Sequence, residues 1–233
     1  MSQRTRVVIE LFAALAVIAA SATLVWTSTT ASKGRSRTAQ AEVPLPESRL
    51  SLRDVALRGS QTAPVGLIVI SDFQCPFCAR FANATLPRIN AKFVETGRVL
   101  LAFRHLPIES IHPAAKISSH AAICAGRQGR FWEMHDALFQ DQPRLGPELN
   151  AELASRIGLV IPRFTQCMAQ DVSSELDSDL RFARSLKVAA TPTLFLGVVT
   201  DGPELIVRRA LQGVQNPEIL ERELNNILAS VGR

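Results

Sequence analysis

Two cysteines, Cys75 and Cys78, have the C-x-x-C spacing of a redox-active pair. Such a pair can open and close a disulfide, and it can pass that disulfide to the cysteines of another protein through a mixed disulfide. The chemistry requires one thiol that attacks as a thiolate and a second thiol that resolves the adduct. Pro76 and Phe77, between the two cysteines, complete the candidate motif.

A buried strand, a short turn and a helix are predicted to position this pair. Residues 67–70 read Leu-Ile-Val-Ile, a continuous apolar run typical of a strand that is covered on both faces. Pro76 suits the first position of a helix because it has no N–H to donate, which leaves Cys75 at the N-terminal cap. Unpaired backbone N–H groups and the helix dipole favour a thiolate there. Cys75 is therefore predicted to attack, and Cys78, on the same helical face, to resolve.

Zinc binding is the alternative function of a C-x-x-C pair. A zinc site usually needs a second pair of similar spacing, but Cys124 and Cys167 stand apart from each other and from the first pair. The four histidines also lack the spacing of a metal-binding set. We therefore favour a redox pair and expect no metal site.

Length and charge limit the other possibilities. The chain has 233 residues and a formal net charge of +5, enough for one domain with or without an insertion. No run of Lys and Arg interleaved with aromatic residues is present, so nucleic-acid binding is not expected. Four cysteines are few for a disulfide-stapled scaffold, so a hydrophobic core must hold the fold.

Residues 1–32 are predicted to be a single-pass membrane anchor. Residues 11–32 carry no charge, and a helix of about 22 residues spans a hydrocarbon core of ~30 Å. A signal peptide cleaved near residues 20–22 is the alternative, but the apolar stretch continues to Trp26, a residue type common at membrane interfaces. Residues 33–48 are predicted to be a linker. The rest of the chain would then lie in the periplasm or another extracytoplasmic space.

Strand and helix patterns alternate through the remaining chain, residues 49–233. The helix that begins at Cys75 is expected to reach about Glu95, and residues 98–103 are predicted to form the second strand of a βαβ unit. An all-helical insertion is predicted at about residues 109–187, followed by a β-hairpin and a last helix. The four expected inserted helices cover 113–125, 130–140, 147–157 and 162–186; the hairpin strands cover 193–199 and 205–207; the last helix covers 217–230.

Five motifs carry a family resemblance. They are SDFQCPFC at 71–78, FRHLPI at 103–108, IHPAA at 111–115, CAGRQGRFWEMHDALF at 124–139 and TPT at 191–193. Together they resemble the DsbA-like thiol–disulfide oxidoreductases. The resemblance implies an α/β thioredoxin fold with an inserted all-helical subdomain, here preceded by the predicted membrane anchor.

The resemblance also implies roles for individual residues. Cys75 would be the nucleophile and Cys78 the resolving thiol. Pro192 would be a cis-proline that faces them, and the backbone of Thr191 would bind a substrate chain in extended form. A backbone contact of that kind is indifferent to the substrate's side chains.

Two positions depart from the family pattern. Phe77 stands where strongly oxidising members carry a His, whose imidazolium would help to stabilise the thiolate. Val69, six residues before Cys75, stands where thioredoxins and many relatives keep a buried acid. Nearby Asp72 is a possible base, but capping of the turn or of the helix start is the favoured role. Both departures bear on the direction in which the pair works.

Cys124 and Cys167 are predicted to form a structural disulfide. Apolar neighbours place both inside the helical insertion, and two separate buried thiols are the alternative. The disulfide is favoured because free thiols in an oxidising compartment would be at risk of oxidation. On the helix near residue 180, a solvated face is expected, formed by Glu175, Asp177, Asp179, Arg181 and Arg184.

These observations predict a membrane-tethered, extracytoplasmic thiol–disulfide oxidoreductase. Its substrates would be cysteine-containing exported proteins, and a membrane redox partner would recycle the dithiol. No cofactor is expected because the redox equivalents travel as the disulfide itself. Family resemblance and compartment favour the oxidase direction. A reductase or isomerase of the same fold remains an alternative, as does a tethered holdase domain whose dithiol is only structural.

Overall fold

The computed structural model describes residues 45–46, 49–170 and 173–232. The predicted anchor at 1–32 lies outside the described residues, as does the linker at 33–48 apart from residues 45–46. Within the described ranges, no helix combines the length and the apolar composition needed to cross a membrane.

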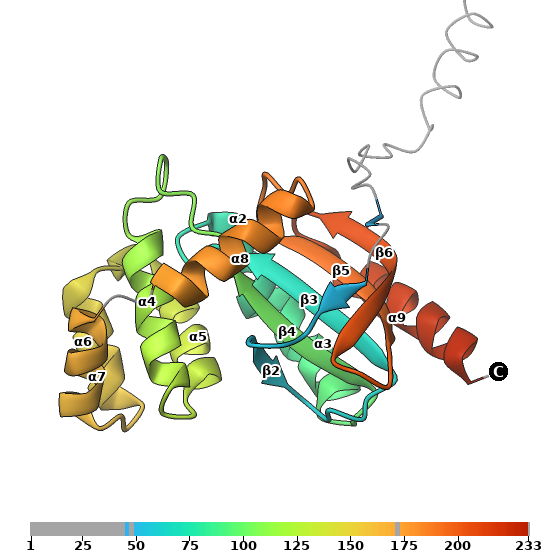
Figure 1. Cartoon of the computed structure of the whole chain (residues 1–233), viewed down its shortest axis with the longest axis horizontal. Coiled ribbons are helices and arrows are strands. Elements are labelled where there is room, and N and C mark those ends of the chain that lie inside the picture. Colours follow the sequence, from blue (N-terminus) through green and yellow to red (C-terminus); the bar gives the residue numbers. More distant parts are fainter. Residues whose placement is uncertain (1–44, 47–48, 171–172, 233) are drawn as a thin grey trace, which may run out of the picture. The chain divides into compact units, whose positions relative to one another are not determined.

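Six strands of the described part form one mixed sheet in the order β1-β6-β5-β3-β4-β2 (Figure 1). The central strand β3 (Val65–Ser71) is parallel to β4 (Val99–His105) and antiparallel to β5 (Thr193–Val199). Every residue of β3 and β4 is buried, which explains the apolar runs at 67–70 and 99–103. The remaining strands are β6 (Glu204–Gln212) beside β5, and the short β1 (Leu50–Ser51) and β2 (Ala56–Arg58) at opposite edges.

One face of the sheet is covered by the helix that follows β3 and by α9 (Pro217–Val231). The first of these runs from Pro76 to Val94, as predicted, but alternates between α and π turns. Its segments are α2 (Pro76–Arg80), η1 (Phe81–Thr85), α3 (Leu86–Ile89) and η2 (Asn90–Val94). Alternate side chains of β3, including Val69, pack beneath this layer. The strand therefore holds the start of α2 on a rigid base.

The predicted helical insertion lies between β4 and β5. Its helices are α4 (Ala115–Gly126), α5 (Phe131–Gln140), the 3₁₀ turn η3 (Gln142–Arg144), α6 (Pro147–Arg156), α7 (Ile161–Ala169) and α8 (Ser173–Ser185). The single helix predicted at 162–186 is thus two helices. The last of them, α8, passes over the sheet face opposite α9 (Figure 1), where Ala183 packs with Ile68 and Ile70.

A buried ion pair fixes α8 to the end of β4. The Asp179 carboxylate lies 2.8 Å from Arg104 Nη1 and also accepts the His105 backbone N–H at 2.8 Å. Asp179 is only 6 % exposed, so the prediction of a solvated face was wrong for this residue. The cause is Arg104, a charged partner on a distant strand that helix periodicity does not reveal.

Candidate active site

Cys75 occupies the N-terminal cap of α2, as the sequence predicted. Its backbone is extended (φ −71°, ψ 122°), and Pro76 is the first helical residue. Both Cys75 and Cys78 are free thiols here, with 4 % and 0 % of their surfaces exposed. Only a small part of Cys75 is therefore accessible to another molecule, and Cys78 is not accessible at all.

The environment of Cys75 favours a thiolate. Its pKa is lowered from an ordinary value of 9.0 to about 5, mainly by a hydrogen bond from the Cys78 side chain. The side chain of Thr191 and the backbone N–H groups of Phe77 and Cys78 contribute in the same direction, while burial opposes them. At neutral pH Cys75 is ionised, so it is both a good nucleophile and a good leaving group.

Cys78 has the opposite character. Burial raises its pKa well above 9.0, and the side chain of Cys75 adds to this increase. The Ser71 side chain acts against the shift, but burial dominates. Cys78 therefore stays protonated until it takes part in an exchange step. The two thiols therefore differ in role: hydrogen bonds favour the ionised form of Cys75, whereas burial keeps Cys78 protonated.

The Thr191–Pro192 peptide bond is cis, in agreement with the expectation from family resemblance. The Thr191 carbonyl oxygen lies 3.5 Å from Cys75 Sγ and accepts a hydrogen bond from it when the thiol is protonated, which places this segment directly against the candidate nucleophile. The Thr191 hydroxyl is buried, and in the described structure it has no hydrogen-bond partner. It is therefore a donor available to a negative charge on Cys75.

Thr191→Val is expected to raise the pKa of Cys75 by about one unit, because the isosteric side chain removes a donor to the thiolate. Thiolate absorbance measured against pH in a Cys78→Ser background provides the titration curve. Thr191→Ser keeps the hydroxyl and is the matched control. Equal midpoints for the Val and Ser variants would show that the hydroxyl does not act on Cys75.

Asp72 and Gln142 hold the loop before Cys75. The buried Asp72 carboxylate accepts the backbone N–H groups of Gln74 and Ile108 and contacts His112 Nδ1, all at 2.7–2.8 Å. The turn-capping role predicted for Asp72 is thus confirmed. Gln142 Nε2 donates to the carbonyls of Phe73 at 2.7 Å and Cys75 at 2.9 Å. Sequence reasoning missed Gln142, since nothing local marks a residue 67 positions from Cys75.

Phe77 and Val69, the two departures from the family pattern, lie in contrasting places. The Phe77 side chain is 53 % exposed beside Cys75, and the guanidinium of Arg80 lies 5.8 Å from its ring centroid. Val69 is 3 % exposed and lines a small enclosed space together with Cys78 and Ser71. A side chain at position 69 therefore faces the resolving thiol, as the alternation of β3 predicted.

Val69→Glu is expected to speed resolution of a Cys75 mixed disulfide by about tenfold near neutral pH, because a carboxylate there can take the proton from Cys78. Burying the carboxyl should lower stability by about 2 kcal/mol. Stopped-flow kinetics of a preformed adduct and urea unfolding measure the two effects. Val69→Gln has the same shape without the acid; an equal rate in both folded variants would mean that proton removal is not limiting.

His105 and His135 are packed in an aromatic cluster behind the dithiol. The His135 ring centroid lies 4.9 Å from that of Phe139 and 5.8 Å from that of Phe73. Burial lowers the pKa of both imidazoles, to about 4 for His105. Both rings are packed core side chains, and both are neutral at physiological pH.

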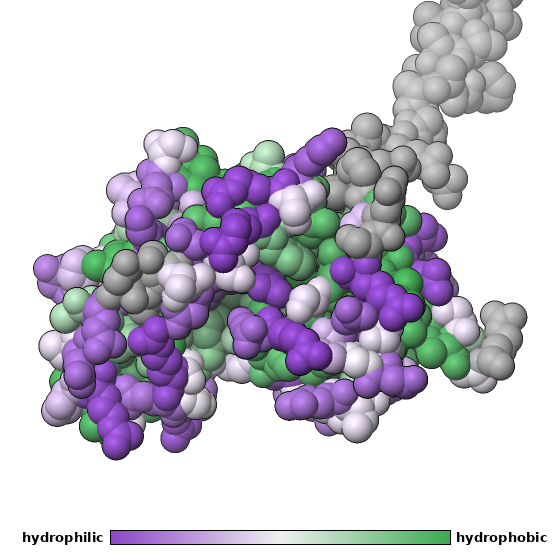
Figure 2. Space-filling view, in the orientation of Figure 1, coloured by the Kyte–Doolittle hydropathy of each residue, from purple (hydrophilic) through white to green (hydrophobic). Residues whose placement is uncertain are grey.

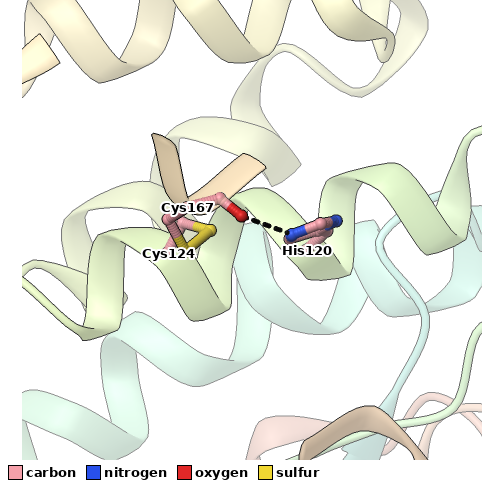
Figure 3. Close-up of side chains that lie close together, drawn as sticks. All are labelled: His120, Cys124 and Cys167. Atoms are coloured by element: carbon pink, nitrogen blue, oxygen red, sulfur yellow. Dashed lines mark hydrogen bonds between the residues drawn. A yellow bond between two sulfur atoms is a disulfide. The ribbon is translucent and has the colours of Figure 1, made fainter. Parts of the chain in front are cut away.

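Cys124 and Cys167 form the expected disulfide, with a Cα–Cα distance of 5.7 Å. It joins α4 to α7 inside the insertion. His120 lies beside it, with Nε2 hydrogen-bonded to the Cys167 carbonyl at 3.2 Å (Figure 3). Within the described part of the chain these three residues form the group of side chains closest to a metal-binding set. The sulfur atoms of Cys124 and Cys167 are bonded to each other, so neither cysteine offers the thiolate that a metal requires.

Known proteins that are similar to this chain share its fold. A protein-family model described as thioredoxin matches residues 52–202. Solved structures with the same fold include α-DsbA1 of Wolbachia pipientis (20 % identity, TM-score 0.67, covering 78 % of this chain and 94 % of that one) and oxidised BdbD of Bacillus subtilis (18 %, 0.68, 79 % and 98 %). The catalytic domain of Proteus mirabilis ScsC also matches (21 %, 0.61, 76 % and 90 %).

Relatives with higher sequence identity are much longer proteins, and this chain matches only a part of each. They include Na⁺/H⁺ antiporter NhaA 3 of Salinispora tropica, 34 % identical over 141 residues, and NhaA 1 of Mycolicibacterium vanbaalenii, 34 % identical over 151 residues. The matches cover 60 % and 63 % of this chain but only 21 % and 24 % of those proteins. The family match spans well over half of residues 1–233, so this chain belongs to the thioredoxin family, and its fold is that of the DsbA-like thiol–disulfide oxidoreductases.

Proposed function

We propose that this protein is a thiol–disulfide oxidoreductase that forms disulfides in exported proteins. The observation that carries the proposal is the contrast between the two thiols: the pKa of Cys75 is lowered to about 5, and that of the buried Cys78 is raised. A structural dithiol has no need of such a difference. An exchange catalyst needs it, because one sulfur must accept and release partners while the other stays internal.

The energy of the reduced form supports the oxidase direction. A stabilised Cys75 thiolate lowers the free energy of the dithiol relative to the disulfide, which makes the disulfide a stronger oxidant. At pH 7 the solution is two units above the pKa of Cys75, and each unit corresponds to about 1.4 kcal/mol. The resulting ~3 kcal/mol raises the reduction potential by roughly 60 mV. This effect supports an oxidase.

Each exchange step forms one S–S bond and breaks another. A substrate thiolate attacks Cys75 Sγ of the Cys75–Cys78 disulfide, forms a mixed disulfide and expels Cys78 as a thiolate that then takes up a proton. A second substrate thiolate attacks the substrate sulfur of that adduct and expels the Cys75 thiolate. The substrate has lost two electrons and this protein has gained them. A membrane redox partner would remove them and restore the disulfide.

Thr191 and Pro192 supply the surface for the substrate chain in this proposal. The Thr191 carbonyl touches Cys75 Sγ, so an extended peptide can pair with this backbone while its cysteine reaches Cys75. Exposed Phe77 adds an apolar contact next to the nucleophile. Because most of these contacts are to backbone, we propose that many cysteine-containing exported proteins are accepted.

We further propose that the domain is tethered to the membrane by residues 1–32 and faces the extracytoplasmic space. The support is the uncharged stretch at 11–32. Fractionation of cells, with protease added to intact spheroplasts, tests this placement. The domain should remain with the membrane and be degraded by external protease.

The in-cell redox state of Cys75 and Cys78 tests the direction. Rapid acid quenching, alkylation and mass analysis should find the pair mostly oxidised. A mostly reduced pair would instead indicate a reductase or isomerase. A pair that stays inert to oxidants and reductants in the native protein would indicate a structural dithiol in a binding domain.

A further inference from the structure

A second site candidate is a cavity of about 450 Å³ that neither Cys75 nor Cys78 lines. It lies between the inserted helices α4, α5 and α8 and the sheet edge formed by β2 and the end of β4. In the space-filling view the hollowed face lies between the inserted helices and the sheet, with hydrophilic residues around it (Figure 2). Its volume is typical of cavities that hold small molecules.

Aromatic side chains form the apolar wall of this cavity. Phe103, Phe131 and Trp132 line it, and the rings of Phe131 and Trp132 pack edge to face with centroids 5.3 Å apart. The Trp132 indole N–H donates to the Leu57 carbonyl at 2.8 Å, which fixes the ring. The wall is thus preformed and does not need to be ordered by a ligand.

His105 contributes a buried polar atom to the lining. The residue is only 5 % exposed, and its Nδ1 has no hydrogen-bond partner in the described structure. Burial keeps the ring neutral by lowering its pKa to about 4. A neutral imidazole nitrogen without a partner is costly unless a bound molecule supplies a complementary group.

The charged residues of the lining give it negative character. Glu175 pairs with Arg127 at the cavity, and Asp179 pairs with buried Arg104. Asp54 also lines the cavity and forms no ion pair with any described residue. The lining residues and Arg104 together carry three carboxylates and two guanidinium groups. Among these described residues, only the charge of Asp54 is left without a partner, so a single positive charge is the complement that the space lacks.

We propose that this cavity binds a small organic cation: a molecule with an ammonium group and a compact aromatic or aliphatic body. The body would pack against this aromatic wall. One face of the Trp132 ring already carries the guanidinium of Arg58, 4.4 Å from its centroid, so the attraction for a cation would come from Asp54. The ammonium group would lie near Asp54, and a polar hydrogen of the ligand would bond to the ring of His105, which lines the cavity. This binding site is independent of the dithiol chemistry proposed above.

Phenethylamine, with its neutral analogue 2-phenylethanol and its anionic analogue 3-phenylpropionate, tests the proposal on the full-length chain. The protein has two tryptophans and no tyrosine, so Trp26→Phe leaves Trp132 as the only indole reporter. Phenethylamine should change the Trp132 fluorescence saturably and bind about fivefold more tightly than the alcohol. 3-Phenylpropionate should bind most weakly. Equal affinity for all three, or preference for the anion, overturns the proposal.

Two variants locate the site. Asp54→Asn should remove most of the preference for the amine over the alcohol, while Asp201→Asn, the same change on the β5–β6 turn, should leave it intact. His105→Phe keeps a packed ring but removes the nitrogen, and should weaken binding of both amine and alcohol. Affinities unchanged by Asp54→Asn and His105→Phe would place the binding elsewhere and refute this site. Absence of any saturable signal up to millimolar probe would refute it as well.

Discussion

Cys78→Ser is expected to accumulate a stable mixed disulfide with a cysteine-containing peptide, whereas Cys75→Ser is expected to form none. The reason is the geometry of the pair: Cys75 carries the lowered pKa at the surface, and Cys78 is fully buried. Without Cys75 the rate of thiol–disulfide exchange should fall by at least about 10³-fold. Incubation with a peptide carrying an activated disulfide, followed by non-reducing electrophoresis and mass analysis, measures both results.

The same experiment has an internal control in the second disulfide. Cys124 and Cys167 remain bonded in both variants, so total thiol content should change only at the active-site pair. An adduct found on Cys78 in the Cys75→Ser variant would reverse the assigned roles. Lack of an adduct in Cys78→Ser, with the fold intact by circular dichroism, would favour the binding-domain alternative.

Local sequence was sufficient to predict the active-site motif. The apolar run at 67–70, the proline at the start of the helix and the two cysteines lie within a dozen residues, so their relative geometry is set by β3 and α2 alone. The cap position of Cys75 and the buried side of Val69 both follow from strand alternation and helix initiation. The cis peptide at Pro192 was available only through the family resemblance.

Long-range partners account for what the sequence did not predict. Gln142 secures the loop before Cys75 from the 3₁₀ turn η3, and Asp179 is buried because Arg104 reaches it from β4. Neither contact leaves a periodic signal, because each depends on how separate elements pack. For Cys124 and Cys167 the sequence offered only an argument from compartment; the 5.7 Å Cα separation, which suits a disulfide, comes from helix packing.

As the pH rises from 5 to 7, the reduced protein should gain about 2–3 kcal/mol of unfolding free energy relative to the oxidised protein. Folding lowers the pKa of Cys75 from 9.0 to about 5. Its contribution to the stability of the reduced form is therefore complete above pH 9 and is lost as the pH falls through 5. The oxidised form has no thiol at this position and lacks the contribution.

Urea unfolding of both redox forms at several values between pH 5 and pH 8 measures this difference. Subtracting the two curves at each pH cancels every group that titrates alike in both forms. The raised pKa of Cys78 has little effect in this range, because an unfolded thiol ionises mainly near pH 9. Cys75→Ser cannot form the active-site disulfide, and its stability should lack the rise with pH that the reduced parent protein shows between pH 5 and pH 7. A gap that stays constant, or that shrinks as the pH rises, would show that Cys75 is not a stabilised thiolate and would remove the main physical support for the oxidase direction.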